Sequence, residues 1–318
     1  MMGRILAHSQ SVFTFKELHF FGGLWVKNSN QKLTRKEQIN LLSRLFCIQS
    51  YGLFNQEGAF KFNSKSAKLL GAGIQNPLEI YKFFLDTVTK ENGAKIACEQ
   101  TPQNAYYLQE LLDFFPKARV INLVRDQRDV LLSQKNKWRR RFLGAKAIPI
   151  SEALRSFVNY HPILTAKVWA SSLSCTVKFF DHPRVKIVKF EDLLTNSETV
   201  VQDICEFLQI EFEDFMLDIP VIGSSTEDDT KSNLFIDRSK INKWKNGGLS
   251  RAEIYLSQIV SSKMMKKFDY KLEKFWIPPL SLGFFLISFP VKLVIAFCFN
   301  IHRMGNIVEV IKKRFFIK

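Results

Sequence analysis

The sequence alternates stretches that have helical spacing of apolar residues with short runs rich in β-branched residues. The three clearest runs lie around Ile96, Ile121 and Ile187, in AKIACEQ, ARVINLVR and RVKIVKF. Each run is short and apolar on both faces, which is typical of a strand buried in a parallel sheet. The alternation predicts an α/β fold with a parallel sheet. VFTF, at 12–15, is a candidate fourth strand.

Helical spacing predicts the elements between these runs. The expected helices cover residues 1–8 and roughly 34–50, 77–91, 103–115, 127–142, 151–181, 197–208 and 250–268. The polar stretch IGSSTEDDTKSN, at 222–233, is typical of an exposed loop. We expect one large domain over 1–270 and a hydrophobic, basic helical appendage over 271–318.

The charge balance favours an anionic partner. The chain has 46 Lys and Arg against 30 Asp and Glu, a net charge of +16. Nucleic acid, a phosphorylated nucleotide, an acidic polymer and a membrane surface all fit this charge. The five cysteines and five histidines are scattered, with no CxxC spacing. This pattern predicts neither a disulfide framework nor a zinc site, and it favours a reducing compartment such as the cytoplasm.

The most informative stretch is RVINLVRDQRDVLLSQKNKW. Here a buried strand delivers Arg125 to its carboxyl end, where open α/β sheets bind ligands, and a helix follows directly. Arg125 is therefore placed to bind a phosphate. Ser133 and Lys137, further along the helix, add a hydroxyl and a second cation if the helix turns them toward the strand ends. The structural alternative is that Arg125 and Asp126 form a capping ion pair.

This stretch also carries a resemblance. LVRDQRDVLLS resembles the 3′-phosphate-binding motif of the sulfotransferase family, whose members use 3′-phosphoadenosine 5′-phosphosulfate (PAPS). Three more blocks resemble that family in the same order: CEQTPQNAYYLQELLDFFPKARVINLVRD, VKFEDLLTNSETVVQDICEFLQI and INKWKNGGLS. The resemblance covers about residues 1–270. It implies a three-layer, P-loop NTPase-like fold with a central parallel sheet, with PAPS as cosubstrate and no metal.

The resemblance also implies residue roles. Arg125 and Ser133 match the pair that holds the 3′-phosphate, and Lys137 takes the place of a further cation. Lys243 matches a lysine that approaches the cofactor phosphates. Looser candidates are Arg238 and Lys245. The alternative for this last group is a solvated basic surface.

The segment SQSVFTFKELHFF resembles the one in which related carbohydrate and protein sulfotransferases place a catalytic glutamate, and Glu17 falls on that position. Glu17 would take the proton of the acceptor hydroxyl, while positioning and electrostatics supply most of the remaining catalysis. The alternative is a surface carboxylate paired with Lys16 or His19. The family often has a lysine where this chain has Gln100, which donates a hydrogen bond without a charge.

The first residues, MMGRILAHSQSVF, resemble the helix that follows the 5′-phosphosulfate loop of the family. That loop, of the type Arg-Ser-Gly-Thr-Thr, and the strand before it have no counterpart in these 318 residues. We therefore expect an N-terminally incomplete fold in which Met1 is an internal methionine of a longer protein. A truncated, non-catalytic relative is the alternative.

The stretch WIPPLSLGFFLISFPVKLVIAFCFN, at 276–300, is long enough to span a membrane but contains Pro290 and Lys292 near its middle. Basic residues follow it at Arg303, Lys312, Lys313 and Arg314. Three interpretations stay open at this point. The segment 276–315 makes a peripheral contact with an anionic membrane, packs on the domain or on a partner subunit, or spans the membrane.

Two other classes of protein compete with the sulfotransferase interpretation. A P-loop kinase would need GxxxxGK[ST], which is absent from the sequence. A basic binding module, with KWRRRF at 137–142 as its patch, lacks any recognised nucleic-acid motif. We therefore expect a PAPS-dependent sulfotransferase that acts on a hydroxyl of a small molecule or glycan, most simply a carbohydrate. We expect no nucleic-acid partner, and a cytoplasmic location with membrane association.

Overall fold

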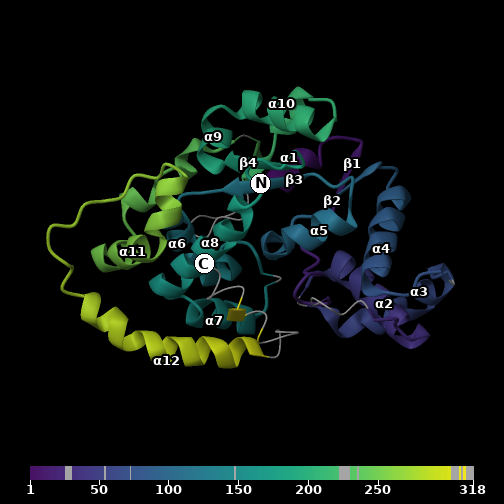
Figure 1. Ribbon diagram of the computed structural model, residues 1–318, viewed down its shortest axis with the longest axis horizontal. Coiled ribbons are helices and arrows are strands. Elements are labelled where there is room, and N and C mark those ends of the chain that lie inside the picture. The colour runs from purple at the N-terminus through teal and green to yellow at the C-terminus, as the bar shows by residue number, and fades with distance from the viewer. Residues whose placement is uncertain are drawn as a thin grey trace. The chain divides into compact units, whose positions relative to one another are not determined.

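The computed structural model describes residues 1–25, 31–53, 55–71, 73–146, 148–221, 230–234, 236–301, 308 and 311–312. It is a mixed α/β structure with small parallel sheets (Figure 1). The chain divides into two compact units, Met1–Ala118 with Cys205–Met216 and Arg119–Ile204 with Leu217–His302. Each unit is described by itself.

The first unit contains a parallel pair of strands, β1 (Val12–Thr14) and β2 (Ile96–Cys98). Val12 lies opposite Ile96 and Thr14 opposite Cys98. The pairing continues past β1, since the Phe15 N–H donates to the Cys98 carbonyl at 2.8 Å. The strands expected around Ile96 and at VFTF are thus confirmed. The carboxyl ends of both strands meet at one edge of this sheet.

Helices pack around these strands, and two of them begin at capping boxes. Thr34 and Glu37 bond each other's backbone N–H at the start of one helix, and Asn76 and Glu79 do so at the start of another. The core is rich in aromatic rings, with Phe20 stacked on Tyr81 at 4.0 Å between centroids. The elements of this unit are α1 (Met2–Leu6), α2 (Arg35–Tyr51), η1 (Gln56–Phe62), α3 (Asn63–Leu69), α4 (Pro77–Glu91), η2 (Pro102–Tyr107) and α5 (Leu108–Phe114), where η denotes a 3-10 helix.

The second unit contains another parallel pair, β3 (Val120–Val124) and β4 (Val185–Lys189), in register from Val120 opposite Val185 to Val124 opposite Lys189. This pair confirms the strands expected around Ile121 and Ile187. The elements after β3, some of which belong to the first unit, are α6 (Gln127–Asn136), η3 (Lys137–Phe142), α7 (Ile150–Val158), α8 (Pro162–Val177), α9 (Phe190–Thr195), α10 (Ser197–Leu208), η4 (Asp214–Leu217), β5 (Pro220–Val221), β6 (Thr230–Leu234), η5 (Arg238–Lys240), η6 (Lys243–Asn246), α11 (Arg251–Lys267) and α12 (Leu282–Asn300).

The strands are less buried than their composition predicts. Ala97 of β2 is exposed, and in β3 Val124 alone is fully buried. Within the described residues, β1 pairs with β2 and β3 with β4 in sheets of two strands. Each of these strands therefore has an unpaired edge, and backbone groups on an edge stay accessible.

Three of the expected helices differ from the structure. The one expected over 151–181 is two helices, because Pro162 starts α8 and His161, which precedes it, is extended with φ −154°. The helix over 127–142 is α-helical to Asn136 and continues as η3, and that over 103–115 begins as η2. Of the loop expected at 222–233, residues 222–229 lie outside the described part. Thr230–Leu234 is a strand, antiparallel to β5.

The C-terminal part begins after α11, which ends at Lys267, and its helix α12 begins at Leu282. The segment between them is tethered, since Gln258 Nε2 donates to the Glu273 carbonyl at 3.1 Å. By length and composition α12 could cross a membrane. The boundary expected between 270 and 271 stays a prediction.

A buried ion pair joins α6 to the start of α11. Glu253, with 2% of its side chain exposed, accepts from Lys135 Nζ at 2.8 Å and from the Tyr160 hydroxyl. It also accepts from the Ser250 N–H at 2.7 Å in the capping box of α11. Burial opposes ionisation of Glu253, but these donors outweigh it and lower the pKa of the carboxyl.

We expect Glu253→Gln to lower the free energy of unfolding by about 2 kcal/mol at neutral pH, less than for a fully buried pair because Lys135 is partly exposed. Because the folded pKa is lowered, this stability is present above the ordinary glutamate pKa and is lost as the pH falls through the folded pKa. Urea denaturation from neutral to acidic pH should show the two proteins converging in acid. Glu37→Gln, at the same position of the exposed α2 capping box, is the matched control. A pH-independent difference would contradict this account.

Candidate functional site

In the first unit, the backbone around Glu17 is held on both sides just beyond the end of β1. The Lys16 N–H donates to Gln49 Oε1 at 3.0 Å. After Glu17, the Leu18 N–H donates to Glu99 Oε1 at 3.1 Å and the His19 N–H to Thr101 Oγ1 at 3.1 Å. The side chains that hold this segment come from α2 and from the turn after β2. Glu17 therefore has a fixed backbone at the carboxyl edge of the sheet.

The Glu17 carboxylate is 55% exposed and lies 3.3 Å from His19, measured from Oε2 to Nε2. Lys16 is used elsewhere, since its Nζ donates to the Ser50 carbonyl at 2.7 Å. Of the two neighbours expected as pairing partners, His19 is in contact with the carboxylate. An exposed carboxylate on a fixed backbone, beside an imidazole, can accept a proton from a bound hydroxyl.

Glu99 is the residue that the sequence analysis missed in this unit. Its carboxylate accepts from the N–H of Leu18 and of Thr101, and from the side chains of Thr101 and Asn104. Burial raises the pKa of Glu99, and these donors oppose the rise. Because Leu18 lies 81 residues away in the chain, no local pattern could reveal this role.

Gln100 closes the same edge of the sheet against α1. Its Nε2 donates to the Phe15 carbonyl at 3.0 Å. A Cβ atom on Gly3 would lie 2.3 Å from Gln100 Oε1, so the helix and this amide are in close contact. The position where the family often has a lysine is here occupied by a neutral side chain that packs on α1.

In the second unit, Arg125 follows β3, as expected. Its Nη2 donates to the Lys240 carbonyl at 2.7 Å, and its guanidinium lies over the Phe190 ring, 4.5 Å from the centroid. Its Nε is buried and, among the described residues, has no hydrogen-bond partner. A buried donor without an acceptor is costly, and an anion at this position would satisfy it.

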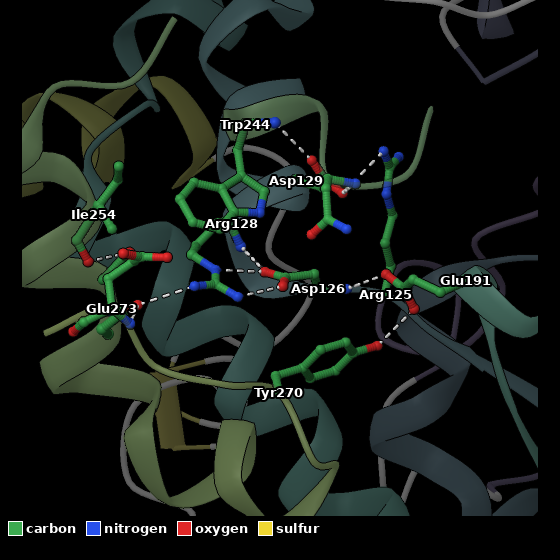
Figure 2. A network of polar contacts seen from close by, with 12 residues as sticks. Arg125, Asp126, Arg128, Asp129, Glu191, Trp244, Ile254, Tyr270 and Glu273 are labelled. Carbon is green, nitrogen blue, oxygen red and sulfur yellow. Dashed lines mark hydrogen bonds and ion pairs between the residues drawn. The ribbon is translucent and has the colours of Figure 1, made fainter. Parts of the chain in front are cut away.

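Asp129, on the next turn of α6, joins Arg125 to the segment that contains Lys243. Its carboxylate accepts from the N–H of Asn242 and of Trp244, both at 3.0 Å, and lies 3.8 Å from Arg125 Nη2 (Figure 2). Burial raises the pKa of Asp129, and the Trp244 N–H and Arg125 oppose the rise. The i, i+4 spacing of Arg125 and Asp129 is a signal in the sequence that could have identified this contact.

A second set of contacts adjoins this arrangement, and its central ion pair between Asp126 and Arg128 is buried. Arg128 donates to Asp126 from Nε at 3.0 Å and from Nη2 at 2.6 Å, and stacks over Trp244 at 4.0 Å (Figure 2). Glu191 accepts from the Asp126 N–H at 2.9 Å and from the Tyr270 hydroxyl at 2.9 Å. Asp126 therefore pairs with Arg128, so Arg125 is not its capping partner.

The remaining expected site residues differ in their surroundings. Ser133 is half-buried, one helical turn beyond Asp129, and Lys137 is exposed at the start of η3. Lys243 is half-buried, directly before the buried Trp244. Arg238 donates to the carbonyls of Leu194 at 3.1 Å and Thr195 at 2.9 Å, and so binds the end of α9.

The structure thus gathers Arg125, Asp129 and the Asn242–Trp244 backbone within the second unit, and holds Glu17 in the first. Ser133 lies on the same helix face as Asp129, because four residues make about one turn. Within the described part of the chain there is no group of three His, Cys, Asp or Glu residues that could hold a metal ion.

Comparison with known proteins identifies the family. The model of the sulfotransferase family matches residues 2–214. The sulfotransferase domain of the curacin biosynthetic pathway is similar, with 19% identity, a TM-score of 0.51 and coverage of 85% of this chain and 93% of that one. The sulfotransferase domain of the Synechococcus PCC 7002 olefin synthase has 18% identity, a TM-score of 0.50 and coverage of 85% and 90%. No curated protein matches the sequence. The family match spans most of the chain, and the chain therefore belongs to the sulfotransferase family.

Proposed function

We propose that this protein transfers a sulfuryl group from PAPS to a hydroxyl of a carbohydrate or related polar acceptor. The observation that carries the proposal is the buried Arg125 Nε at the carboxyl end of a parallel strand, a donor for which the described residues provide no acceptor. Membership of the family supplies the class of reaction, and the Arg125 site supplies the reason to expect a nucleotide phosphate.

The residues of the second unit fit a 3′-phosphate. Arg125 would donate from Nε, while its Nη2 remains bonded to the Lys240 carbonyl. Ser133 would add a hydroxyl, and Lys137 and Lys243 would add positive charge. Arg238 is the weakest candidate, since its guanidinium already binds two carbonyls of α9.

Glu17 would act on the acceptor. PAPS, when bound, supplies the activated sulfuryl group. Glu17 would accept the proton of the acceptor hydroxyl at its exposed carboxylate, with His19 at 3.3 Å orienting that carboxylate. Gln100 has an uncharged N–H donor that could contact the sulfuryl group. Because its Nε2 already donates to the Phe15 carbonyl, we assign Gln100 mainly to packing.

The finer features of the proposal rest on the family and on composition. We propose a three-layer, P-loop NTPase-like fold with a central parallel sheet, which the similarity to sulfotransferase domains supports. The scattered cysteines support a reducing compartment such as the cytoplasm. Acceptor recognition would come from segments such as 18–76 and 142–182.

A pair of nucleotides tests the proposal without knowledge of the acceptor. Adenosine 3′,5′-bisphosphate and adenosine 5′-phosphate differ in the 3′-phosphate alone. We expect the full chain to bind the bisphosphate at least about 10-fold more tightly by calorimetry, because charge-assisted hydrogen bonds reach the additional phosphate. Equal affinity for the two nucleotides would instead favour a basic binding module. Binding with discrimination but without transfer would favour a non-catalytic relative.

A further inference from the structure

One face of α12 is hydrogen-bonded to other elements of the second unit near both of its ends; we call it the fastened face. Near its start, His161 Nε2 donates to the Phe285 carbonyl at 3.1 Å, because His161 Nδ1 accepts from the Ile163 N–H and so carries no proton. Near its end, Asn300 Nδ2 donates to Asn159 Oδ1 at 2.8 Å, and Asn300 Oδ1 accepts from Arg155 Nη1 at 2.8 Å. Phe285 and Asn300 are about four turns apart, so both lie on the same face of the helix.

Lys292 lies on this fastened face too, about two turns beyond Phe285. Its Nζ is 5.3 Å from the centroid of the Phe157 ring, which belongs to α7. Lys292 is the one charged residue in the sequence of α12, and it points toward the domain. The charge that argues against a membrane span is therefore turned away from the free side of the helix.

The opposite face of α12 is apolar and exposed. Phe284, Ile287, Val291 and Val294 follow at spacings of three and four residues, and each is between 61% and 80% exposed. Cys298, which is also exposed, continues the same row. We call these five residues the outer face. A row of this length is far more apolar than the surface that a water-facing helix normally presents.

A second apolar row lies on α7, which runs alongside α12 (Figure 1). Ile150, Leu154 and Phe157 share one face of α7 and are each more than half exposed. Trp138 of η3 stacks edge-on against Phe157 at 5.9 Å. Exposed apolar side chains are therefore present on α7 as well as on α12, and η3 packs against the α7 row through Trp138.

Exposed positive charge lies next to the α7 row. Arg139 is exposed beside Trp138, with its guanidinium 5.4 Å from that ring, and Lys146 is exposed after η3. The sequence from 274 to 318 contains seven Lys and Arg residues and one Glu. An apolar face bordered by cations complements a bilayer whose headgroups are anionic, rather than an apolar patch on another protein.

We propose that the outer face of α12, with the apolar row on α7, docks this protein on the surface of an anionic lipid bilayer. The helix lies in the plane of the interface, because its other face is bonded to the domain at both ends. The apolar side chains enter the boundary between headgroups and acyl chains, and the cations contact the headgroups. This proposal is independent of the sulfotransferase activity.

Flotation of the full chain with vesicles tests the docking. We expect binding to phosphatidylcholine vesicles that contain phosphatidylserine, and weaker binding to phosphatidylcholine alone or at high salt. Replacing Ile287, Val291 and Val294 by Gln should weaken partition by about 100-fold, since three apolar side chains no longer leave water. Gln has a good helix propensity, so the helix should be kept, which circular dichroism would verify. Replacing Phe60, Phe215 and Ile259, which are exposed apolar residues of the other elements η1, η4 and α11, by Gln is the matched control and should leave partition unchanged.

Cys298 reports the depth of the helix. Cys47 and Cys205 are buried and Cys98 and Cys175 are half-buried, so a Cys98→Ser, Cys175→Ser background leaves Cys298 as the accessible thiol. A polarity-sensitive fluorophore there should shift to the blue with vesicles and be quenched more by a shallow than by a deep spin-labelled lipid. Stronger quenching by the deep label, or unchanged partition of the Gln variant, would overturn the proposal. So would a parent protein that forms a dimer and does not bind vesicles, if the Gln variant dissociates that dimer.

Discussion

The variant Glu17→Gln is expected to lower the rate of sulfuryl transfer by about 10²- to 10⁴-fold, the range found when a general base is removed. Gln keeps the size of the side chain and its contact with His19 but cannot accept the acceptor's proton. Because the carboxylate is 55% exposed, thermal stability should change little. The measurement is transfer of labelled sulfate from PAPS to a panel of polyhydroxylated acceptors, with the affinity for adenosine 3′,5′-bisphosphate measured alongside.

Two comparisons make this result specific to Glu17. Glu57→Gln removes the same charge from an exposed glutamate on η1 and should leave the rate unchanged. The affinity for the bisphosphate should also stay the same in the Glu17 variant, since the nucleotide phosphate is assigned to other residues. A Glu17→Gln protein that transfers sulfate at the parent rate would rule out the assigned base.

The variant Arg125→Ala should lose the preference for the nucleotide that carries a 3′-phosphate. We expect its affinity for adenosine 3′,5′-bisphosphate to fall by about 10- to 100-fold, the effect of removing charge-assisted hydrogen bonds. Its affinity for adenosine 5′-phosphate should change much less, because that nucleotide lacks the group that Arg125 contacts. Calorimetry of the parent and the Arg125→Ala protein with each nucleotide gives the coupling free energy between Arg125 and the 3′-phosphate. A general loss of structure would weaken the binding of both nucleotides and would not produce this coupling.

Stability is the main concern for this variant. Arg125 also bonds the Lys240 carbonyl and stacks on Phe190, so its removal should lower the melting temperature to some degree. Arg125→Lys keeps the charge but not the planar guanidinium, and should recover part of the affinity. Arg139→Ala removes an exposed arginine of η3 and controls for net charge. Equal losses for both nucleotides would contradict a contact with the 3′-phosphate.

The local pattern of residues was sufficient to predict most of the individual helices and strands. The runs around Ile96, Ile121 and Ile187 are strands, because short β-branched apolar stretches favour extended backbone whatever surrounds them. The helix caps are local features too, since the side chains of Thr34 and Asn76 each accept a hydrogen bond from the backbone N–H three residues later. Where the expected helices were wrong, as at Pro162, the preceding residue was forced out of helical geometry.

The candidate site was predicted in part. The position of Arg125 after a strand was predicted because the end of a strand is a local feature, and its role in binding stays a prediction. The role of Glu99 was not predicted, because no local sequence pattern around a single carboxylate indicates a partner 81 residues away. The close contact of Gln100 with Gly3 could not be predicted either, since it depends on the approach of α1 to the strand ends.

The sequence by itself determined the α/β class, the position of Arg125 after a strand, the family, and the apolar composition of α12. These properties depend on the spacing of residues that are close in the chain. The tertiary structure decided which donors and acceptors meet, so that Asp126 pairs with Arg128, and no acceptor in the described part of the chain reaches the Arg125 Nε. It also decided that Lys292 faces Phe157, and so left α12 with an uncharged outer face. Such pairings arise between segments distant in sequence, where packing and burial, rather than local propensity, select the partner.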